Sequence, residues 1–333
     1  DVTNKINSDA YNEEEETNYL IDDAEKKIFS VTKARKAGEF KSIASVMKSA
    51  QEQIEKLAKN QNEITGLATG FYDLDKLTSG LHENELIIFA ARPAMGKTAF
   101  ALNLAVNAAS KSDKAVALFN LEMSAEQLAM RMIAAAGGIE MNKVRTGRLE
   151  HNDWKKVNEA MSELSETNLY IEDNAGMTIS EIRAKCRRLA TSDKGLGLIV
   201  IDYLQLISGS SKNEGNRVQE VSEISRSLKT MAMELKVPVV ALAQLSRSVE
   251  LRENKRPIMS DLRESGSIEQ DADIVMFLYR DDYYNKAAAE QTDTSITELI
   301  IGKHRNGGTG TIELLFERSM SNFRNYIKKN EEN

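Results

Sequence analysis

The sequence contains a single cysteine and only three histidines among its 333 residues. The one cysteine, Cys186, cannot form a disulfide within the chain, and this usage is typical of a reducing compartment. The histidines His82, His151 and His304 lie far apart and show no metal-site spacing. No hydrophobic run is long enough for a membrane span, no signal peptide opens the chain, and no internal repeat is present. We therefore expect a cytoplasmic protein with no membrane partner.

The length suits one large domain or two average ones, and the 41% hydrophobic and 29% charged residues are typical of globular proteins. The net charge of −7 argues against a generally basic nucleic-acid binder. However, residues 13–16 contribute four of the acidic charges, and residues 244–263 carry five basic against three acidic side chains. Local charge matters more than the total where a partner touches one surface. The start at Asp1 rather than Met suggests a segment of a longer protein.

The most informative stretch runs from residue 86 to residue 98. Five apolar residues over 86–90 predict a strand buried on both faces, and an alanine-rich pattern over 99–109 predicts a helix. The tripeptide Gly96-Lys97-Thr98 stands at the predicted helix start, which is the layout of a P-loop. The pattern departs from the usual one at its first position, where Ala91 replaces glycine.

The chemistry of this loop points to a bound triphosphate. A helix N-terminus offers unpaired N–H groups and the positive end of a dipole to phosphate oxygens. Gly96 allows the backbone to approach the phosphates closely. Lys97 would reach the β- and γ-phosphates, and the Thr98 hydroxyl would hold Mg²⁺.

Predicted strands and helices alternate through the rest of the chain, which indicates an α/β fold with a doubly wound, mainly parallel sheet. Such sheets bind ligands beyond the carboxyl ends of their strands. Further strands are expected over 116–121, 169–171, 198–201, 239–243, 274–279, 296–301 and 311–316, with Asn306-Gly307-Gly308 as a hairpin signal between the last two. Helices are expected over 124–136, near Lys143 and Trp154, over 180–189, and from about 217 to 236.

The N-terminal part stands outside this alternation. Residues 1–18 are polar and acidic, and we expect a disordered tail. Residues 19–38 predict an amphipathic helix whose apolar stripe needs a partner in this subunit or in another. A second amphipathic helix follows over about 43–57, and residues 66–80 look like a loop. The main domain is predicted to span 39–330.

Three polar side chains are expected beside the P-loop, because each follows or ends a predicted parallel strand. Asp202 comes after an apolar run in the Walker B manner and could hold Mg²⁺. Glu122 could orient and deprotonate an attacking water, and Gln244 could sense the γ-phosphate. Any one of them alone would more often be a solvated strand end, but together they favour nucleotide hydrolysis.

Two basic residues, Lys303 and Arg305, stand just before the predicted hairpin tip. A charge at such a position usually faces water. From a tip, however, an arginine can also reach a neighbouring subunit and stabilise charge that develops on a γ-phosphate.

Several motifs together resemble the bacterial replicative DNA helicases of the DnaB family. The similarity extends over nearly the whole chain from about Asp22 and rests on the stretches ARPAMGKTAFALNLA, FNLEMS, IVIDYLQLI, ALAQLSR, LRESGSIEQDAD and KHRNGGTG. It implies a RecA-like P-loop NTPase domain that uses ATP and Mg²⁺. It also implies a homohexameric ring that encircles single-stranded DNA and moves 5′ to 3′. That family tolerates alanine at the position of Ala91.

The resemblance implies a role for each matching residue. The nucleotide would be held by Ala94, Met95, Gly96, Lys97, Thr98, Ala99, Arg131 and Asp202, with Thr98 and Asp202 at the metal and Arg131 against the base. Glu122 would be the catalytic carboxylate and Gln244 the γ-phosphate sensor. Lys303 and Arg305 would act on the neighbouring subunit, with Arg305 as the arginine finger.

The resemblance also implies contacts with partners. DNA would be gripped by Arg263, Glu264 and Gly266, with a second pore loop over Ser208 to Arg217. The helix over 19–38 would be a linker helix that docks on the adjacent subunit. A helicase loader is an expected partner. Primase would bind through an N-terminal helical domain that this sequence lacks.

Two other classes of function stay open from the residues alone. One is a recombinase-like RecA ATPase that forms filaments on DNA. The other is a platform for assembly or loader binding, which nucleotide locks without motor activity. The matches at the finger and pore-loop stretches favour the helicase over both.

Overall fold

The computed structural model describes residues 40, 42–59, 64–208, 216–262, 266–284 and 293–327. The chain divides into two compact units, Asp1–Asn62 and Glu63–Asn333. The described part of the first unit is α3 (Ile43–Lys59), which agrees with the second predicted N-terminal helix. The predicted tail and the helix over 19–38 lie outside the described residues, so the domain bounds drawn there stay a prediction.

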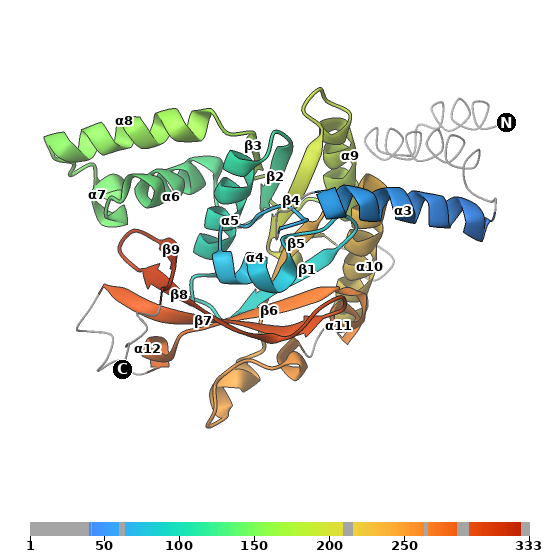
Figure 1. Cartoon of the computed structure of the whole chain (residues 1–333). Coiled ribbons are helices and arrows are strands. Elements are labelled where there is room, and N and C mark those ends of the chain that lie inside the picture. The colour runs from blue at the N-terminus through green and yellow to red at the C-terminus, as the bar shows by residue number, and fades with distance from the viewer. Residues whose placement is uncertain are drawn as a thin grey trace, which may run out of the picture. The chain divides into compact units, whose positions relative to one another are not determined.

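The second unit is built on one nine-stranded sheet among the described residues, in the order β3-β2-β4-β5-β1-β6-β7-β8-β9. The first six in that order run parallel, and β7, β8 and β9 add an antiparallel extension, as Figure 1 shows. The strands are β1 (Leu86–Ala91), β2 (Ala115–Asn120), β3 (Leu169–Glu172), β4 (Leu196–Asp202), β5 (Val239–Gln244), β6 (Ile274–Tyr279), β7 (Thr294–His304), β8 (Gly310–Glu317) and β9 (Asn322–Asn325). The predicted doubly wound α/β sheet is confirmed.

Helices cover both faces of this sheet. One face packs on α4, α5 and α6, and the other packs on α9 and α10. The α-helices of this unit are α4 (Tyr72–Thr78), α5 (Lys97–Lys111), α6 (Ala125–Gly137), α7 (Met141–Thr146), α8 (His151–Ser165), α9 (Ile179–Ala190), α10 (Arg217–Leu235), α11 (Gly266–Asp271) and α12 (Asp281–Tyr284). Short 3-10 turns span Leu204–Leu206, Arg247–Leu251 and Met259–Leu262.

Strand β1 lies in the middle of the sheet, between β5 and β6. All six of its residues are buried, because alternate side chains enter the two hydrophobic layers. Ile87 and Phe89 pack on the α5 side, while Leu86 and Ile88 pack on the α10 side. This double burial explains why the sequence shows a continuous apolar run here and not an alternation.

The prediction of a loop over 66–80 was wrong, because α4 lies within it. The Asp75 carboxylate accepts hydrogen bonds from the backbone N–H groups of Thr69 (2.8 Å) and Gly70 (3.1 Å). It fixes the chain ahead of the helix, and Leu74 inserts into the core with no exposed surface. The helix has only seven residues, which is too short for a clear helical spacing of apolar residues. The glycines on either side of it therefore dominated the sequence pattern and suggested a loop.

Cys186 lies on α9 and is fully buried in the core beneath the sheet. Burial in apolar surroundings raises the pKa of its thiol to about 12, so the thiol stays protonated at neutral pH. The residue is a packing element.

None of the helices that the structure describes combines the length and the hydropathy needed to cross a bilayer.

Phe100 on α5 is the centre of an aromatic cluster that ties α5 to the sheet. Its ring stacks on Phe71 and Phe89 at centroid distances of 4.8 and 4.5 Å, and Phe323 meets it edge-on at 5.6 Å.

We expect Phe100→Ala to lower the free energy of unfolding by about 3–5 kcal/mol, because the resulting cavity cannot collapse. Urea titration measures this loss. The control Tyr72→Ala removes an exposed ring and should change stability by less than about 0.5 kcal/mol. Equal losses of stability for the two variants would contradict the placement of Phe100 at the centre of the buried aromatic cluster.

Candidate functional site

The P-loop connects the end of β1 to the start of α5. Gly96 has a φ of 101°, and a Cβ atom there would lie 3.0 Å from Phe323 Cζ. Both observations require glycine at this position. Ala91, in contrast, is the last residue of β1 and keeps an extended backbone. An alanine therefore costs nothing at the first position of the motif.

The head of α5 meets the end of β4 through a buried carboxylate. Thr98 Oγ1 donates a hydrogen bond to Asp202 Oδ2 over 2.6 Å, and Lys97 Nζ lies 3.1 Å from Asp202 Oδ1. Only 1% of Asp202 is exposed. Burial lowers the pKa of Lys97, and the Asp202 charge partly opposes this shift. The Lys97 ammonium also lies 4.2 Å from the centroid of the Tyr203 ring, a cation–π contact.

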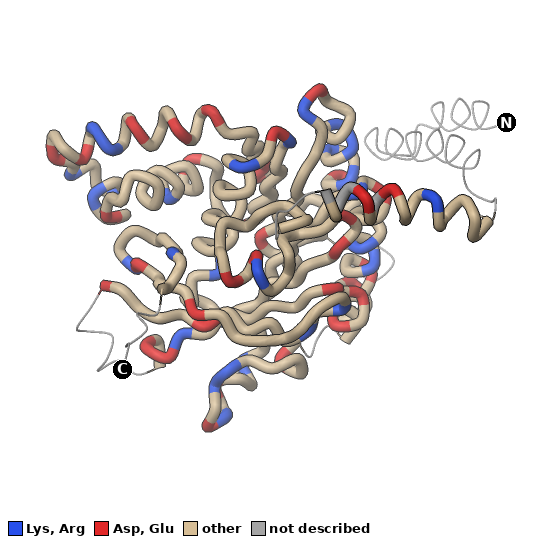
Figure 2. Tube along the Cα trace, viewed as in Figure 1, with Lys and Arg blue, Asp and Glu red and all other residues tan. Residues whose placement is uncertain are grey.

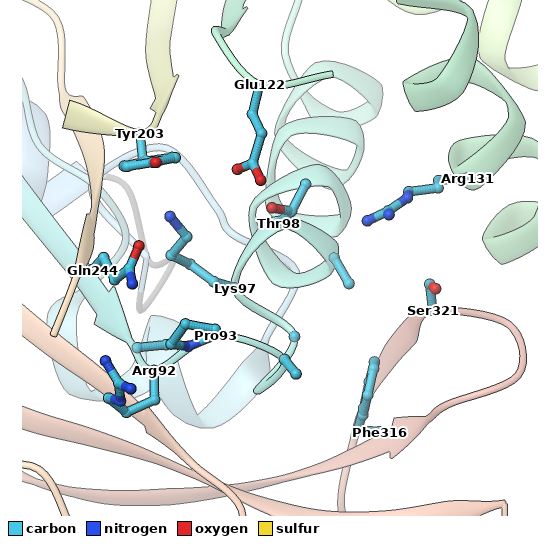
Figure 3. A pocket seen from close by; sticks show the side chains of 14 residues that line it. Arg92, Pro93, Lys97, Thr98, Glu122, Arg131, Tyr203, Gln244, Phe316 and Ser321 are labelled. Atoms are coloured by element: carbon cyan, nitrogen blue, oxygen red, sulfur yellow. The ribbon is translucent and has the colours of Figure 1, made fainter. Parts of the chain in front are cut away.

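Lys97, Thr98 and Tyr203 line a cavity of about 330 Å³ at the carboxyl ends of the parallel strands, and Asp202 lies behind Lys97 and Thr98 without lining it. Glu122 reaches toward it from beyond β2, Gln244 from the end of β5, and Arg131 from α6 (Figure 3). Of the predicted nucleotide-binding residues, Ala94, Gly96, Lys97, Thr98, Ala99 and Arg131 line the cavity. The topology thus brings together the predicted residues of four separate segments.

Met95 is the exception in the predicted loop. Its side chain is 1% exposed and packs in the core between the sheet and α5, away from the cavity lining. Any contact that it makes with a ligand therefore comes from its backbone. The side chain is apolar because the loop must also be anchored to the core.

Sequence reasoning missed several residues of the site. Tyr203, Phe316 and Ser321 line the cavity, and the last two come from the antiparallel extension. Tyr203 follows Asp202 directly, so the strand-end argument could have found it. Nothing in the sequence marks Phe316 or Ser321, because they reach the cavity only through the pairing of β8 with β9.

Asn120 is a further missed residue, and it organises two of the predicted ones. Its amide oxygen accepts hydrogen bonds from the N–H groups of Glu122 (3.0 Å) and Met123 (2.7 Å). Its amide nitrogen donates to Asp202 Oδ2 over 3.3 Å. This buried side chain therefore holds the turn that carries Glu122 against the carboxylate at the end of β4.

The oxygen atoms here fit a hard divalent cation such as Mg²⁺. Asp202 Oδ1 is buried and lies beside the Lys97 ammonium, and the Thr98 hydroxyl donates to the neighbouring oxygen. No cluster of three or more His, Cys, Asp or Glu side chains suited to a metal occurs within the described ranges. Thr98 and Asp202 would thus supply only part of a coordination shell. Mg²⁺ is usually bound in this way, with water and phosphate oxygens as the other ligands.

Lys303 and Arg305 lie near the amino-terminal end of the central strand β1, on the side of the sheet's strand ends opposite the cavity. The Arg305 N–H donates to the Asp273 carbonyl over 2.8 Å, and the Asp273 N–H donates to the carbonyl of Leu86, the first residue of β1. The P-loop leaves the other end of β1, and six residues of strand span about 20 Å. An arginine side chain cannot cover that distance, so Arg305 cannot serve the cavity of its own chain.

The predicted DNA-binding residues are described only in part. Gly266 is the first residue of α11, while Arg263, Glu264 and residues 209–215 lie outside the described ranges. The described residues between β5 and α11, 245–262, include basic and acidic residues interspersed along the chain (Figure 2).

Two arginines of this segment are engaged within the chain. Arg252 pairs with Asp261 over 2.7 Å, and Arg256 pairs with Glu298 over 2.6 Å. The local excess of positive charge expected between residues 244 and 263 is therefore balanced in part by internal ion pairs.

Comparison with known proteins identifies the matching family and several relatives. The family model described as DnaB-like helicase C terminal domain matches residues 66–325. The chain is 54% identical to the replicative DNA helicase DnaB of Geobacillus stearothermophilus over 98% of this chain and 71% of that protein. It is 53% identical to the replicative DNA helicase DnaC of Bacillus subtilis (strain 168), over 97% of this chain and 70% of that protein.

Two solved structures share this architecture. One, described as an ATPase domain, has a TM-score of 0.80 and 43% identity, and it matches over 87% of this chain and 100% of that chain. The other is described as a DnaB-like replicative helicase and its interactions with primase. It has a TM-score of 0.84 and 39% identity, over 98% of this chain and 75% of that chain.

The bridging role of Asn120 gives a prediction with a defined pH dependence. Asn120→Asp would bring a second carboxylate against Asp202, and repulsion would raise the pKa of one of the two in the folded state. Unfolded carboxyls titrate near pH 4. Stability should therefore fall as the pH rises from about 4 toward the raised pKa, with a loss of about 2 kcal/mol at pH 7. Denaturant titrations at pH 5 and pH 7 measure the difference.

The variant Asn120→Ala is the matched control. It removes the hydrogen bond to Asp202, and also the two from the Glu122 and Met123 N–H groups that an aspartate can still accept, but it adds no charge. Its loss of stability should therefore be similar at both pH values. A loss for Asn120→Asp that does not grow with pH would contradict the proximity of the two carboxylates.

Proposed function

Because this chain belongs to the DnaB-like helicase C-terminal domain family, we propose that it is the ATP-driven motor of a replicative DNA helicase. The enzyme hydrolyses ATP and unwinds DNA. The observation that carries this function is the cavity at the P-loop, where the Lys97 ammonium at the head of α5 lies with the Glu122 carboxylate and the Gln244 amide from the ends of two strands.

In the proposed reaction, ATP binds with its phosphates at the start of α5. Lys97 contacts the β- and γ-phosphates. Thr98 and Asp202 would hold Mg²⁺, which when bound would neutralise phosphate charge. Glu122 orients the attacking water and accepts its proton. Gln244 contacts the γ-phosphate and changes its contacts when that group leaves. The position of Arg131 at the cavity rim supports a contact with the base.

Lys303 and Arg305 complete the site of a neighbouring subunit. Their position supports this arrangement. The P-loop lies at the carboxyl end of β1 and the two basic residues lie near its amino end, so one protomer presents them in opposite directions. Contacts of this head-to-tail kind form a closed ring when the rotation between neighbouring subunits closes, and an open filament when it does not. We propose a homohexameric ring in which Arg305 stabilises charge on the γ-phosphate of the adjacent subunit.

The proposed ring encircles single-stranded DNA and moves along it from 5′ to 3′. Arg263, Glu264 and Gly266 grip its backbone, and the segment from Ser208 to Arg217 forms a second contact. Binding through phosphates needs no base readout, so it tolerates any sequence. We propose a helicase loader as a partner, primase contact through an N-terminal domain, and action in the cytoplasm. The relative solved as a DnaB-like helicase is described with its interactions with primase, which supports that contact.

Neither alternative function is favoured. A filament-forming recombinase and a nucleotide-locked platform would both use a P-loop. However, both relatives compared over nearly the whole chain are named replicative DNA helicases.

The shared site is tested by mixing two inactive variants. Lys97→Ala should abolish turnover by removing the phosphate contact. Arg305→Ala should keep nucleotide binding and lower kcat by roughly 10³–10⁵-fold, because a finger acts on the transition state. In an equimolar mixture, about a quarter of the interfaces would combine an intact P-loop with an intact finger. Steady-state ATPase assays should then show turnover that neither protein has alone.

The control for this experiment is each variant mixed with itself at the same total concentration. Absence of any recovered turnover, with both proteins monomeric by light scattering in the presence of ATP and oligonucleotide, would contradict the ring.

The DNA contact predicts a salt-dependent affinity. For single strands, log K should fall with log salt at a slope of about −0.7 for each phosphate neutralised. Arg263→Ala should reduce the steepness of that slope and leave ATPase activity without DNA largely unchanged. Filter binding of an oligonucleotide at several salt concentrations measures both proteins, and an unaltered slope would argue against Arg263 as a phosphate contact.

A further inference from the structure

The two basic residues at the far edge of the sheet are held by one short segment, residues 269–273, which we call the finger cradle. Lys303 Nζ donates to the carbonyl oxygens of Glu269 (2.6 Å) and Ala272 (2.7 Å). The Arg305 guanidinium donates to the carbonyl of Gln270 (2.8 Å) and to Asp273 Oδ1 (3.2 Å). Every hydrogen bond recorded for these two side chains among the described residues thus ends on the cradle.

The cradle suits cations for two reasons. It includes the last residues of α11, where backbone carbonyls lack helical partners and the dipole is negative. Asp273 then adds a full negative charge, and it is the cradle's only side-chain contact with either basic residue. The proximity of the pair has a measurable consequence, because burial and the nearby Arg305 charge lower the pKa of Lys303.

Asp273 is itself held rigidly. Only 4% of the residue is exposed, and its Oδ2 accepts hydrogen bonds from the Leu86 N–H (2.8 Å) and from Lys229 Nζ (2.6 Å). Its backbone also bonds to Leu86 and to Arg305. The carboxylate is therefore fixed to the start of the central strand, and Lys229 balances its charge independently of Arg305.

One oxygen of this fixed carboxylate is left to face Arg305. Because Lys229 and Leu86 occupy Oδ2, Oδ1 is free to orient the guanidinium without having to be neutralised by it. The Arg305 side chain stays 47% exposed, so part of its planar fork faces away from the chain. A half-exposed arginine with no such support would lose rotamer entropy on meeting a triphosphate.

We propose that Asp273 is a positioning residue for Arg305, which fixes the guanidinium of one subunit for the ATP site of the next. This inference rests on the proposed trans-acting role of Arg305. It implies that Asp273 affects hydrolysis in the neighbouring subunit, and that the P-loop of its own subunit works without it.

Asp273→Asn, which keeps the shape of the side chain, tests the proposal. The variant should lower kcat by about 10–100-fold, the range seen when a supporting partner is lost, with KM for ATP unchanged. Mixed with Lys97→Ala protomers, it should recover turnover, because those protomers supply intact fingers to its intact P-loops. Mixed with Arg305→Ala protomers, it should recover none, because neither protein has a working finger.

Asp75→Asn is the matched control. Asp75 is equally buried and also accepts backbone N–H groups, but it contacts neither basic residue. Its variant should lose stability and keep kcat near that of the unchanged chain. Should Asp273→Asn not fold, as judged by thermal melting, Asp273→Glu takes its place in the same mixtures.

Three results would overturn the proposal. One is normal turnover by Asp273→Asn alone. The second is a loss that Lys97→Ala protomers do not recover although they do recover Arg305→Ala, which would make Asp273 merely structural while the shared site stands. The third is that Lys97→Ala protomers recover turnover with neither Asp273→Asn nor Arg305→Ala. This result would remove the trans-acting finger and the positioning role with it.

Discussion

The architecture depends on one buried carboxylate, Asp202, where the sheet meets the P-loop. Its two oxygens contact Thr98 and Lys97, and its burial makes each contact stronger than it would be in water. Removing the charge would leave the largely buried Lys97 ammonium without its partner. The carboxylate can sit there because β4 runs parallel to β5 and β2, with apolar layers on both sides. The chemistry at the cavity therefore relies on the packing of the whole sheet.

The same sheet separates the two halves of the proposed reaction. Its carboxyl edge carries the cavity with Glu122 and Gln244, while Lys303 and Arg305 lie at the start of the central strand. With the proposed trans-acting Arg305, such a division would make a single protomer incomplete as a catalyst. It would also make hydrolysis depend on contact between subunits in the proposed ring.

The sequence was most informative where the fold repeats a simple rule. Continuous apolar runs such as 86–90 predicted buried parallel strands, and from them followed the shared edge that unites Lys97, Glu122, Asp202 and Gln244. The helix expected over 124–136 is α6, and the Ser124 side chain caps its start.

Prediction failed where long-range pairing or a single side chain decides the structure. Helix α4 depends on Asp75, whose carboxylate collects backbone donors that no periodicity reveals. Phe316 and Ser321 reach the cavity through β8 and β9, far along the chain from the P-loop. The support of Arg305 by Asp273 was equally hidden, because 32 positions separate them in sequence. Strand order, which local sequence does not encode, creates the second and third of these contacts.

The location of the finger cradle links two proposed functions through one short helix. Gly266, a proposed DNA contact, is the first residue of α11, and the carbonyls that hold Lys303 and Arg305 begin at Glu269 in the same helix. A helix of six residues is about 9 Å long and moves as one body, since its hydrogen bonds leave little internal freedom. In a ring, the segment that faces DNA in one subunit and the groups that complete the next ATP site would therefore share a single rigid element. Such an element allows a change at either end to reach the other without rearranging the sheet between them.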